Sequence, residues 1–334
     1  MKSYDVYALG NALVDIEYHK TAAELVSMGI EKGVMTLIDE QLHNHLVTYL
    51  GDQHEKMACG GSAANSLIAI AQLGGQGYFS CCVANDMAGQ FFVQDLKKSG
   101  LYTNADGHMI DGGKSGKCLV FVTPDADRTM NTFLGASADL NDSFVSEQAI
   151  ADSVYVYLEG YLVTDQRSRE AVLKAKHYAV KHGVKTALTL SDPNMMRFFR
   201  EGMLEMIGDG VDLLFANEEE AQELTETTSR ELMIERMKTH ATTFAITLGA
   251  EGALIFDGES CIQIPGHSVN SIDTLGAGDM FAGAFLYGLT HGYGYEESAQ
   301  LAALASAKIV TQYGPRLSTE QSLEILRQFS TANL

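Results

Sequence analysis

A glycine-rich run with carboxylates at positions 273 and 279, Asp273 to Gly283 (DTLGAGDMFAG), has the composition of an anion-binding site. Gly276, Ala277 and Gly278 lead into an apolar stretch that predicts a buried helix. The first N–H groups of a helix have no partner within it, and small residues let a ligand's oxygens approach them. Asp279 would repel a phosphate, so it makes sense as a base for a hydroxyl that attacks a phosphoryl group held by these amides. The alternative is a plain helix N-terminus in which Asp279 only interacts with the helix dipole.

Polar residues also follow the first predicted strand. Residues 4–10 (YDVYALG) read as a strand, and Asn11 and Asp15 come just after its end. In open α/β sheets, ligands bind beyond the carboxyl ends of the strands. The two side chains are therefore candidates for a binding site, although a turn Asn and a solvent-exposed Asp would explain them equally well.

A third group lies at the start of another predicted helix. Gly60 and Gly61 precede a helical stretch that ends near Gly74, where glycine is common after a helix C-terminus. Ser62 and Asn65 stand three residues apart in its first turns, so they share one face. This face is a second candidate for contact with a polar ligand.

These candidate residues need a framework that brings them together. The pattern alternates strands and helices in β-α-β-α order, which favours a parallel sheet covered by helices. Strands are predicted at residues 4–10, 33–38, 77–83, 153–158, 184–190, 211–216, 243–248 and 253–256. Helices are predicted at residues 21–29, 39–50, 90–99, 165–182, 296–312 and 318–329.

One segment breaks this alternation. Residues 117–123 and 128–134 read as the two strands of a β-hairpin, joined by a turn at 124–127. A hairpin among alternating units indicates an outlying flap. Together with the extended segments 11–18 and 33–38, it predicts a small sheet that covers the candidate site.

The composition of the chain excludes several classes of protein. The chain has 334 residues, of which 46% are hydrophobic and 20% charged, enough for one large α/β domain with an appendage or for two domains. A net charge of -20 argues against a nucleic-acid partner and suits a cytosolic protein. No apolar run reaches the length of a membrane span and the N-terminus does not read as a signal peptide, so we expect a cytoplasmic protein without a membrane partner. The five cysteines include no Cys-x-x-Cys pair, so reduced thiols are expected.

Two nucleotide-binding motifs can be rejected. The segment 113–115 (GKS) resembles the end of a P-loop, but His108 stands where the first glycine is needed, and the following residues 117–123 read as a strand. A dinucleotide fingerprint beginning at Gly276 would need a glycine where Phe281 stands. The sequence therefore argues against both a P-loop protein and a Rossmann oxidoreductase.

The string Asp-Thr-x-Gly-Ala-Gly-Asp at 273–279 resembles, without substitution, the second signature of the ribokinase-like (PfkB) carbohydrate kinase family. The resemblance implies that Asp279 is the catalytic base, and that the amides of Gly276, Ala277 and Gly278 form the anion hole. It also implies the family's fold, a three-layer α/β/α domain with a mostly parallel central sheet and a small β-sheet lid.

Other matches extend over nearly the whole chain. Residues 60–65 resemble the family's first signature, and Gly-Asn-x-x-x-Asp at 10–15 resembles its substrate-binding pattern. The carboxylate of Asp15 and the amide of Asn65 can each fix a sugar hydroxyl and so position the attacking oxygen. The residues that the resemblance assigns to the substrate's sugar are Asn11, Asp15, Gly60, Gly61, Ser62 and Asn65.

The residues expected to contact ATP and Mg²⁺ are also assigned from the resemblance. Asn-x-x-Glu at 217–220 resembles the family's magnesium motif, in which Glu220 acts on Mg²⁺, often through water. The alternative is an acid-rich helix N-terminus, which the dipole favours anyway. The residues that we expect beside the co-substrate ATP are Asn194, Asn217, Thr247, Gly249, Gly252, Asp273 and Thr274.

Within the family the chain is most similar to the adenosine kinase branch. Residues 60–66 (GGSAANS) and the hairpin at 128–134 resemble that branch, and Met130 and Phe133 could wall a nucleobase. Sugar kinases show Asp-x-Asn-x-Arg near residue 192, whereas Arg197 comes one residue late here. The substrate therefore stays open between a nucleoside and a sugar such as fructose, ribose or 2-keto-3-deoxygluconate.

The predicted lid carries Arg128, which could contact the transferring phosphate or only pair with Asp125 or Asp127. We expect one kinase domain over residues 1–334, with a lid formed by about 11–38 and 107–135, that phosphorylates a primary hydroxyl of a nucleoside ribose. A ligand sensor without activity is the alternative from another class. The sequence leaves open whether the protein is a monomer or a homodimer and whether a monovalent cation such as K⁺ activates it.

Overall fold

The computed structural model describes residues 2–33, 35–51, 54–125 and 128–332. Within these residues, nine strands form one large sheet and five form a smaller one. The strands of the large sheet, in spatial order, are β14 (Cys261–Pro265), β13 (Gly252–Phe256), β12 (Ala241–Thr247), β11 (Val211–Asn217), β10 (Lys185–Thr189), β9 (Ser153–Glu159), β1 (Tyr4–Leu9), β5 (Gly77–Ser80) and β6 (Tyr102–Thr103). The pairs from β12 to β6 are parallel, and β13 and β14 are antiparallel at one edge.

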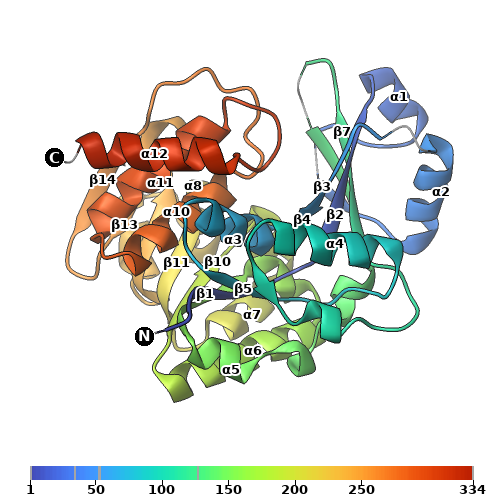
Figure 1. The fold of residues 1–334 in the computed structure, drawn as a ribbon. Helices are drawn as coiled ribbons and strands as arrows, with labels where there is room; N and C mark the ends of the chain where they lie inside the picture. Colours follow the sequence, from blue (N-terminus) through green and yellow to red (C-terminus); the bar gives the residue numbers. More distant parts are fainter. Residues whose placement is uncertain (1, 34, 52–53, 126–127, 333–334) are drawn as a thin grey trace.

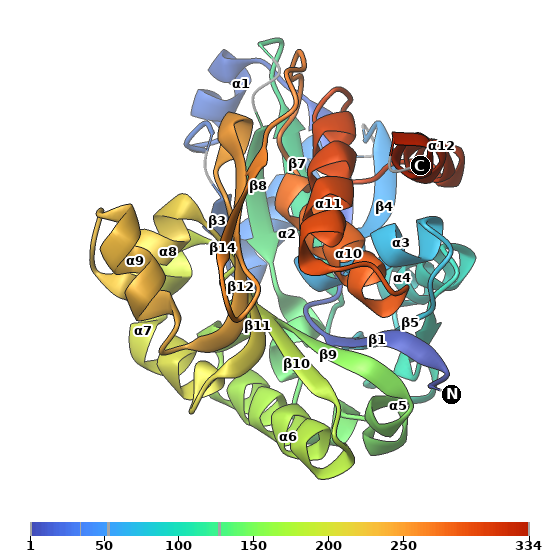
Figure 2. The same cartoon turned by 90° about the vertical axis from the view of Figure 1, so that its left-hand side faces the viewer.

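Helices cover both faces of the large sheet (Figure 2). Strand β1 shows why its sequence is apolar throughout: Val6 and Ala8 enter the core on one face, and Tyr7 and Leu9 enter the core on the other. One face packs against α3 (Ser62–Gln72), α10 (Ala277–Thr290) and α11 (Tyr295–Ile309). The other packs against α5 (Glu147–Ala151), α6 (Gln166–His182), α7 (Pro193–Ile207), α8 (Glu218–Thr225) and α9 (Arg230–Met237). The predicted three-layer α/β/α arrangement is therefore confirmed.

The small sheet stands beside this body and carries its own helical cover (Figure 1). Its strands, in spatial order, are β3 (Met35–Leu37), β8 (Arg128–Phe133), β7 (Gly116–Val122), β2 (Leu13–His19) and β4 (Lys56–Gly60). Helices α1 (Ala22–Ser27) and α2 (Glu40–Leu50) bury the apolar side chains of its outer face. Helix α4 (Met87–Lys98) contacts β4 and β2 at the base of this sheet, and α12 (Thr319–Ala332) packs against α11 and α3.

The hairpin and the two extended segments predicted for the small sheet are present. Strand β4 was not expected, because its sequence KMACG has no clear alternation and runs straight into the Gly60–Gly61 turn. It pairs with β2 in antiparallel register, which places Leu13 opposite Gly60. The extra strand matters for the site, because it places Gly60 directly beside the carboxylate of Asp15.

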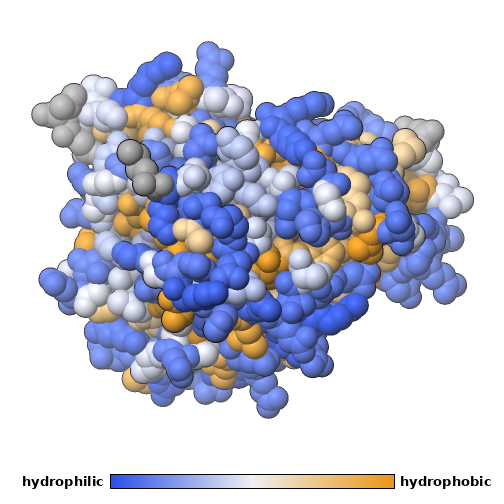
Figure 3. All heavy atoms as spheres, turned by 60° about the horizontal axis from the view of Figure 1, so that its bottom comes forward, coloured by the Kyte–Doolittle hydropathy of each residue, from blue (hydrophilic) through white to orange (hydrophobic). Residues whose placement is uncertain are grey.

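The surface agrees with the charged composition. On the face shown in Figure 3, hydrophobic residues are scattered among hydrophilic ones. In the part of the chain that the structure describes, we find no helix with both the length and the apolar character of a membrane span.

Candidate active site

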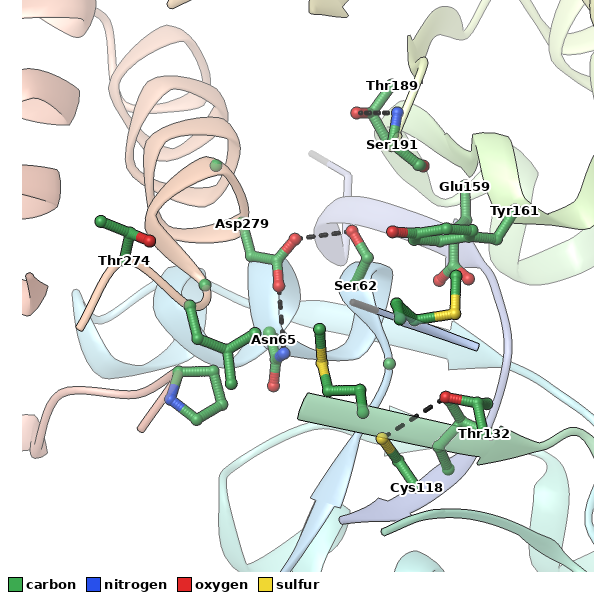
Figure 4. A pocket seen from close by; sticks show the side chains of 18 of the residues that line it. Ser62, Asn65, Cys118, Thr132, Glu159, Tyr161, Thr189, Ser191, Thr274 and Asp279 are labelled. Atoms are coloured by element: carbon green, nitrogen blue, oxygen red, sulfur yellow. Dashed lines mark hydrogen bonds between the residues drawn. The ribbon is translucent and has the colours of Figure 1, made fainter. Parts of the chain in front are cut away.

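Asp279 lies in the first turn of α10 and contacts two side chains of α3. Its Oδ1 accepts a hydrogen bond from Ser62 Oγ at 2.6 Å, and its Oδ2 accepts one from Asn65 Nδ2 at 3.0 Å (Figure 4). Burial raises the pKa of Asp279 to about 6, and the two hydrogen bonds and the charge of Arg316 act in the opposite direction. The carboxylate is thus ionised at neutral pH and has a pKa close enough to neutrality to accept a proton.

Glu159, at the end of β9, holds the start of α3 and the loop after β1 in place. The N-cap of α3 is Gly61, which offers no side chain, and the Oε2 of Glu159 accepts from the Ala63 N–H at 2.9 Å instead. Its Oε1 accepts from Asn11 Nδ2 at 3.0 Å. Burial raises the pKa of Glu159 to about 7. Glu159 was not among the residues predicted for the site, although a polar residue at the carboxyl end of a buried strand is the same signal that pointed to Asn11.

The two glycines before α3 fit closely against the substrate-binding candidates. A Cβ atom on Gly60 would lie 2.3 Å from both carboxylate oxygens of Asp15. Gly61 has a φ of 102°, and a Cβ there would lie 2.3 Å from the backbone oxygen of Asn11. The predicted group Asn11, Asp15, Gly60, Gly61, Ser62 and Asn65 is therefore brought together around one point. Burial raises the pKa of Asp15 to about 7.

A cavity of about 620 Å³ lies between the two sheets. Such a volume suits a ligand of nucleoside or small-nucleotide size. One side is polar and carries Asn11, Asp15, Ser62, Asn65, Glu159 and Asp279. The small sheet contributes Asp15 and Arg128 as well, but its remaining lining residues, together with Leu134 just after β8, form a mainly apolar wall: Leu13, Met35, Leu37, Cys118, Val120, Met130, Thr132 and Leu134. Figure 4 shows Cys118 and Thr132 of this sheet across the pocket from Asp279.

The prediction for Phe133 needs correction. Arg128, Met130 and Thr132 of β8 line the cavity, so the residues between them point to the other face of the sheet. The ring of Phe133 stacks there on His43 of α2, with 4.9 Å between ring centroids and 30° between ring planes. Met130 is therefore a wall of the cavity, whereas Phe133 belongs to the packing of the small sheet against its helices.

Arg128 lines the cavity and forms ion pairs with one residue of the small sheet and one residue of the loop before α10. Its Nε lies 2.8 Å from Asp273 Oδ2, and its Nη2 lies 3.3 Å from Glu17 Oε2. Asp125, one of the predicted partners, pairs with Lys32 at 2.5 Å. The other predicted partner, Asp127, lies outside the described residues. The guanidinium thus sits at the cavity wall, where it links the small sheet to the loop before α10.

The predicted anion hole is only partly in place. Gly276 and Gly278 line the cavity together with Asp273 and Thr274. Ala277 is not among the lining residues, and its N–H donates to the Thr274 carbonyl oxygen at 3.2 Å. Gly276 and Gly278 are therefore the two members of the predicted trio that face the cavity at the positive end of α10.

On the predicted nucleotide side, Asn217, Glu220 and Thr247 line the cavity. Asn217 and Glu220 form a capping box: Asn217 Nδ2 donates to Glu220 Oε1 at 2.7 Å, and the Asn217 N–H donates to its Oε2 at 3.0 Å. Burial raises the pKa of Glu220 to about 7. Gly249 and Gly252 form the turn between β12 and β13, and Asn194 is exposed in the first turn of α7; these three are not among the lining residues.

The donor set around Glu220 fits Mg²⁺ only through water. Among the described residues there is no group of three or more His, Cys, Asp or Glu side chains arranged to hold a metal ion. Both oxygens of Glu220 already accept hydrogen bonds from Asn217. Because Mg²⁺ usually keeps several of its waters, a single acid at the cavity wall remains compatible with it.

The fold and the cavity together define a class: a ribokinase-like α/β/α domain with a small sheet over an acidic site. The pfkB family carbohydrate kinase model matches residues 25–322. The chain therefore belongs to the PfkB family of carbohydrate kinases, as the Asp273–Asp279 string predicted. The fold of the solved relatives confirms the predicted fold class.

Known relatives differ in their substrates. The structure resembles a probable sugar kinase from Rhizobium etli CFN 42, with 33% identity, a TM-score of 0.90 and 99% of both chains covered. It also resembles the adenosine kinase from Sinorhizobium meliloti, with 35% identity, a TM-score of 0.88 and coverage of 97% of this chain and 99% of the other. A 5-dehydro-2-deoxygluconokinase from Bacillus subtilis (strain 168) is 26% identical over 324 residues, covering 93% of this chain and 91% of its own.

Proposed function

We propose that this protein transfers the γ-phosphoryl group of ATP to the primary 5′-hydroxyl of a purine nucleoside. The observation that carries the proposal is the two-sided cavity, in which the Asp279 cluster faces an apolar wall from the small sheet. Hydroxyl groups of a ribose match the polar side, and a flat base matches the apolar side. The similarity to the adenosine kinase of Sinorhizobium meliloti supports the same substrate class.

The chemistry follows from the position of Asp279. Asp15 and Asn65, with Asn11 close by, hold ribose hydroxyls, which places the primary hydroxyl beside the Asp279 carboxylate. Asp279 accepts the hydroxyl proton while the hydroxyl oxygen forms a bond to the γ-phosphorus and the bond to the leaving ADP oxygen breaks. The N–H groups at the start of α10, at Gly276 and Gly278, stabilise the charge on the transferring group.

Mg²⁺ would be held near Glu220 through water. When bound to ATP it would neutralise charge on the phosphate oxygens. Arg128 offers a second positive charge at the cavity wall, paired here with Asp273 and Glu17. Closure of the small sheet over the ligand would exclude water and so limit hydrolysis of ATP.

A sugar kinase is the second candidate, and one observation favours it. The ring of Phe133 stacks on His43 outside the cavity, so the wall facing the polar residues offers Met130, Leu134 and Val120 but no aromatic ring from β8. The similarity to a 5-dehydro-2-deoxygluconokinase points the same way. The two candidates share Asp279 and differ in what the apolar wall contacts.

A substrate panel separates these candidates. We expect ATP consumption with Mg²⁺ in the presence of adenosine, and lower or no consumption with ribose, fructose or 2-keto-3-deoxygluconate. The same assay with inosine and guanosine reports how strictly the base is recognised. Turnover confined to free sugars would refute the nucleoside assignment and leave the phosphotransfer chemistry in place.

Activity should depend on pH through the buried acids. Burial raises the pKa of Asp279 to about 6 and that of Asp15 to about 7, and the charge of Asp279 contributes to the raised pKa of Asp15. The base must be ionised, so kcat/KM is expected to rise with pH across this range and to level off above it. The measurement is kcat/KM from about pH 5 to about pH 9 with saturating ATP. A profile that stays flat through pH 6 would contradict the role of Asp279.

A further inference from the structure

A turn between α11 and α12, residues 314–316, contacts both motifs of the site. The Gly314 N–H donates to Asp273 Oδ2 at 2.8 Å. Pro315 lines the cavity and packs against Gly276 so closely that a Cβ atom there would lie 2.6 Å from the proline Cβ. The Arg316 Nε donates to Asn65 Oδ1 at 3.1 Å. None of the motifs described above includes a residue of this turn.

Arg316 is largely buried, with 16% of its side chain exposed, and its guanidinium is fixed on three sides. Besides Asn65, Nη1 lies 3.3 Å from Asp95 Oδ2, and Nη2 lies 3.1 Å from Cys59 Sγ. The same Asp95 oxygen accepts the Cys59 N–H at 2.9 Å. The guanidinium therefore ties α4, the end of β4 and the first turns of α3 into one unit.

The two partners of Asn65 determine how its amide is oriented. A guanidinium only donates hydrogen bonds, so the atom that faces Arg316 must be Oδ1. An ionised carboxylate only accepts them, so the atom that faces Asp279 must be Nδ2. Removal of Arg316 takes away the contact that holds Oδ1, so the amide is then held through its contact with Asp279 and is less firmly fixed.

We propose that Arg316 is a positioning residue for the catalytic base: it holds the Asn65 amide in the orientation that donates to Asp279. The proposal rests on the proposed phosphotransfer. Arg316 is not among the residues that line the cavity, so it acts through Asn65 and through its charge.

The charge of Arg316 has a second effect on the site. The charged or titratable groups that act on Asp279 or feel its charge are Asp15, Glu159, Tyr157, Tyr161 and Arg316. Within the described part of the chain, Arg316 is the cation in this set, and it lowers the pKa of both Asp279 and Asp15, while Arg128 also lowers the pKa of Asp15. Its loss should therefore shift the rise of kcat/KM to higher pH.

Kinetics of Arg316→Gln and Arg316→Lys test the proposal. We expect Arg316→Gln to lower kcat about tenfold, the size of one lost charge-assisted hydrogen bond. The rise of kcat/KM with pH, which forms the acidic limb of the profile, should also move to higher pH. Arg316→Lys keeps the charge but not the planar fork, so the limb should return toward its original pH while kcat stays low. Arg167, paired with Asp139 and Asp165 on the surface, provides the control Arg167→Gln, which should change neither quantity.

Two further results decide the matter. In an Asn65→Ala background, and at a pH above the rise of kcat/KM, Arg316→Gln should lower kcat no further, because the positioning effect of Arg316 passes through Asn65. Fully additive losses, or an unshifted pH profile in a well-folded Arg316→Gln variant, would overturn the proposal.

A crystal structure of Arg316→Gln tests the same proposal without depending on turnover. If the Asn65 amide still donated to Asp279 in that structure, the positioning role would be refuted. Lack of turnover by the wild type would instead refute the proposed function.

Discussion

Replacement of Asp279 by Asn is expected to lower kcat by about 10²–10⁴-fold, the contribution typical of a general base. The amide has nearly the shape of the carboxylate, so α10 should keep its packing and the cavity its volume. Its oxygen can still accept a hydrogen bond from Ser62 Oγ, but the side chain cannot take up the hydroxyl proton. Initial rates with ATP and the preferred acceptor measure kcat, and calorimetry of the same variant measures the dissociation constants of both ligands.

We expect those dissociation constants to stay close to the wild-type values. The control variant is Asp257→Asn, in the surface turn between β13 and β14, where the acid accepts backbone N–H groups of Glu259 and Ser260. It should keep the full rate. An Asp279→Asn variant with a normal rate would contradict the mechanism. Tight ligand binding without turnover in the wild type would instead support a ligand sensor.

Gly60→Ala is expected to lower kcat/KM by about 10²-fold, because misplacing a substrate-holding group by about 1 Å can cost that much. The new methyl group would begin 2.3 Å from both oxygens of Asp15. Since the close neighbour is the end of a side chain, the protein can fold by turning Asp15 away, and the loss should fall on substrate binding. The measurement is a comparison of KM and kcat for the acceptor, with circular dichroism to confirm folding.

The matched control is Gly107→Ala. Gly107 has no neighbouring atom within 4 Å of its Cβ position, so the added methyl group meets no contact. Unchanged kinetics are expected for this variant. If Gly60→Ala also left KM unchanged, Asp15 would not hold the substrate, and the assignment of the polar side of the cavity would be wrong.

The fold was largely predictable because its pattern is local. The apolar runs of strands such as 153–159 and the glycines and small residues near 276 carry their structure in their own sequence. Strand β4 was missed because KMACG shows no alternation, and only its pairing with β2 makes it a strand. The face of the small sheet on which Phe133 lies could have been predicted. Phe133 stands three positions from Met130, and side chains alternate along a strand with a period of two residues, so the two side chains point to opposite faces.

Residues that act through distant partners were harder to find. Arg316 lies 251 positions from Asn65, and nothing near it in the sequence indicates that contact. Glu159 accepts the N–H of Ala63, which lies 96 positions before it in the first turn of α3, and this role appears only when β9 and α3 are placed together. The capping box of Asn217 and Glu220 was visible as a local pattern, and the structure places it at the cavity wall.

The central claim is that this chain phosphorylates the primary hydroxyl of a purine nucleoside, and the most direct test identifies the product. Purified protein is incubated with ATP, Mg²⁺ and adenosine, and phosphorus NMR follows the reaction. We predict a new phosphate-ester signal coupled to the 5′ protons of the ribose, growing together with ADP, and absent when Asp279→Asn replaces the wild type. ADP and inorganic phosphate alone, or a phosphate ester formed only when a free sugar replaces adenosine, would contradict the claim.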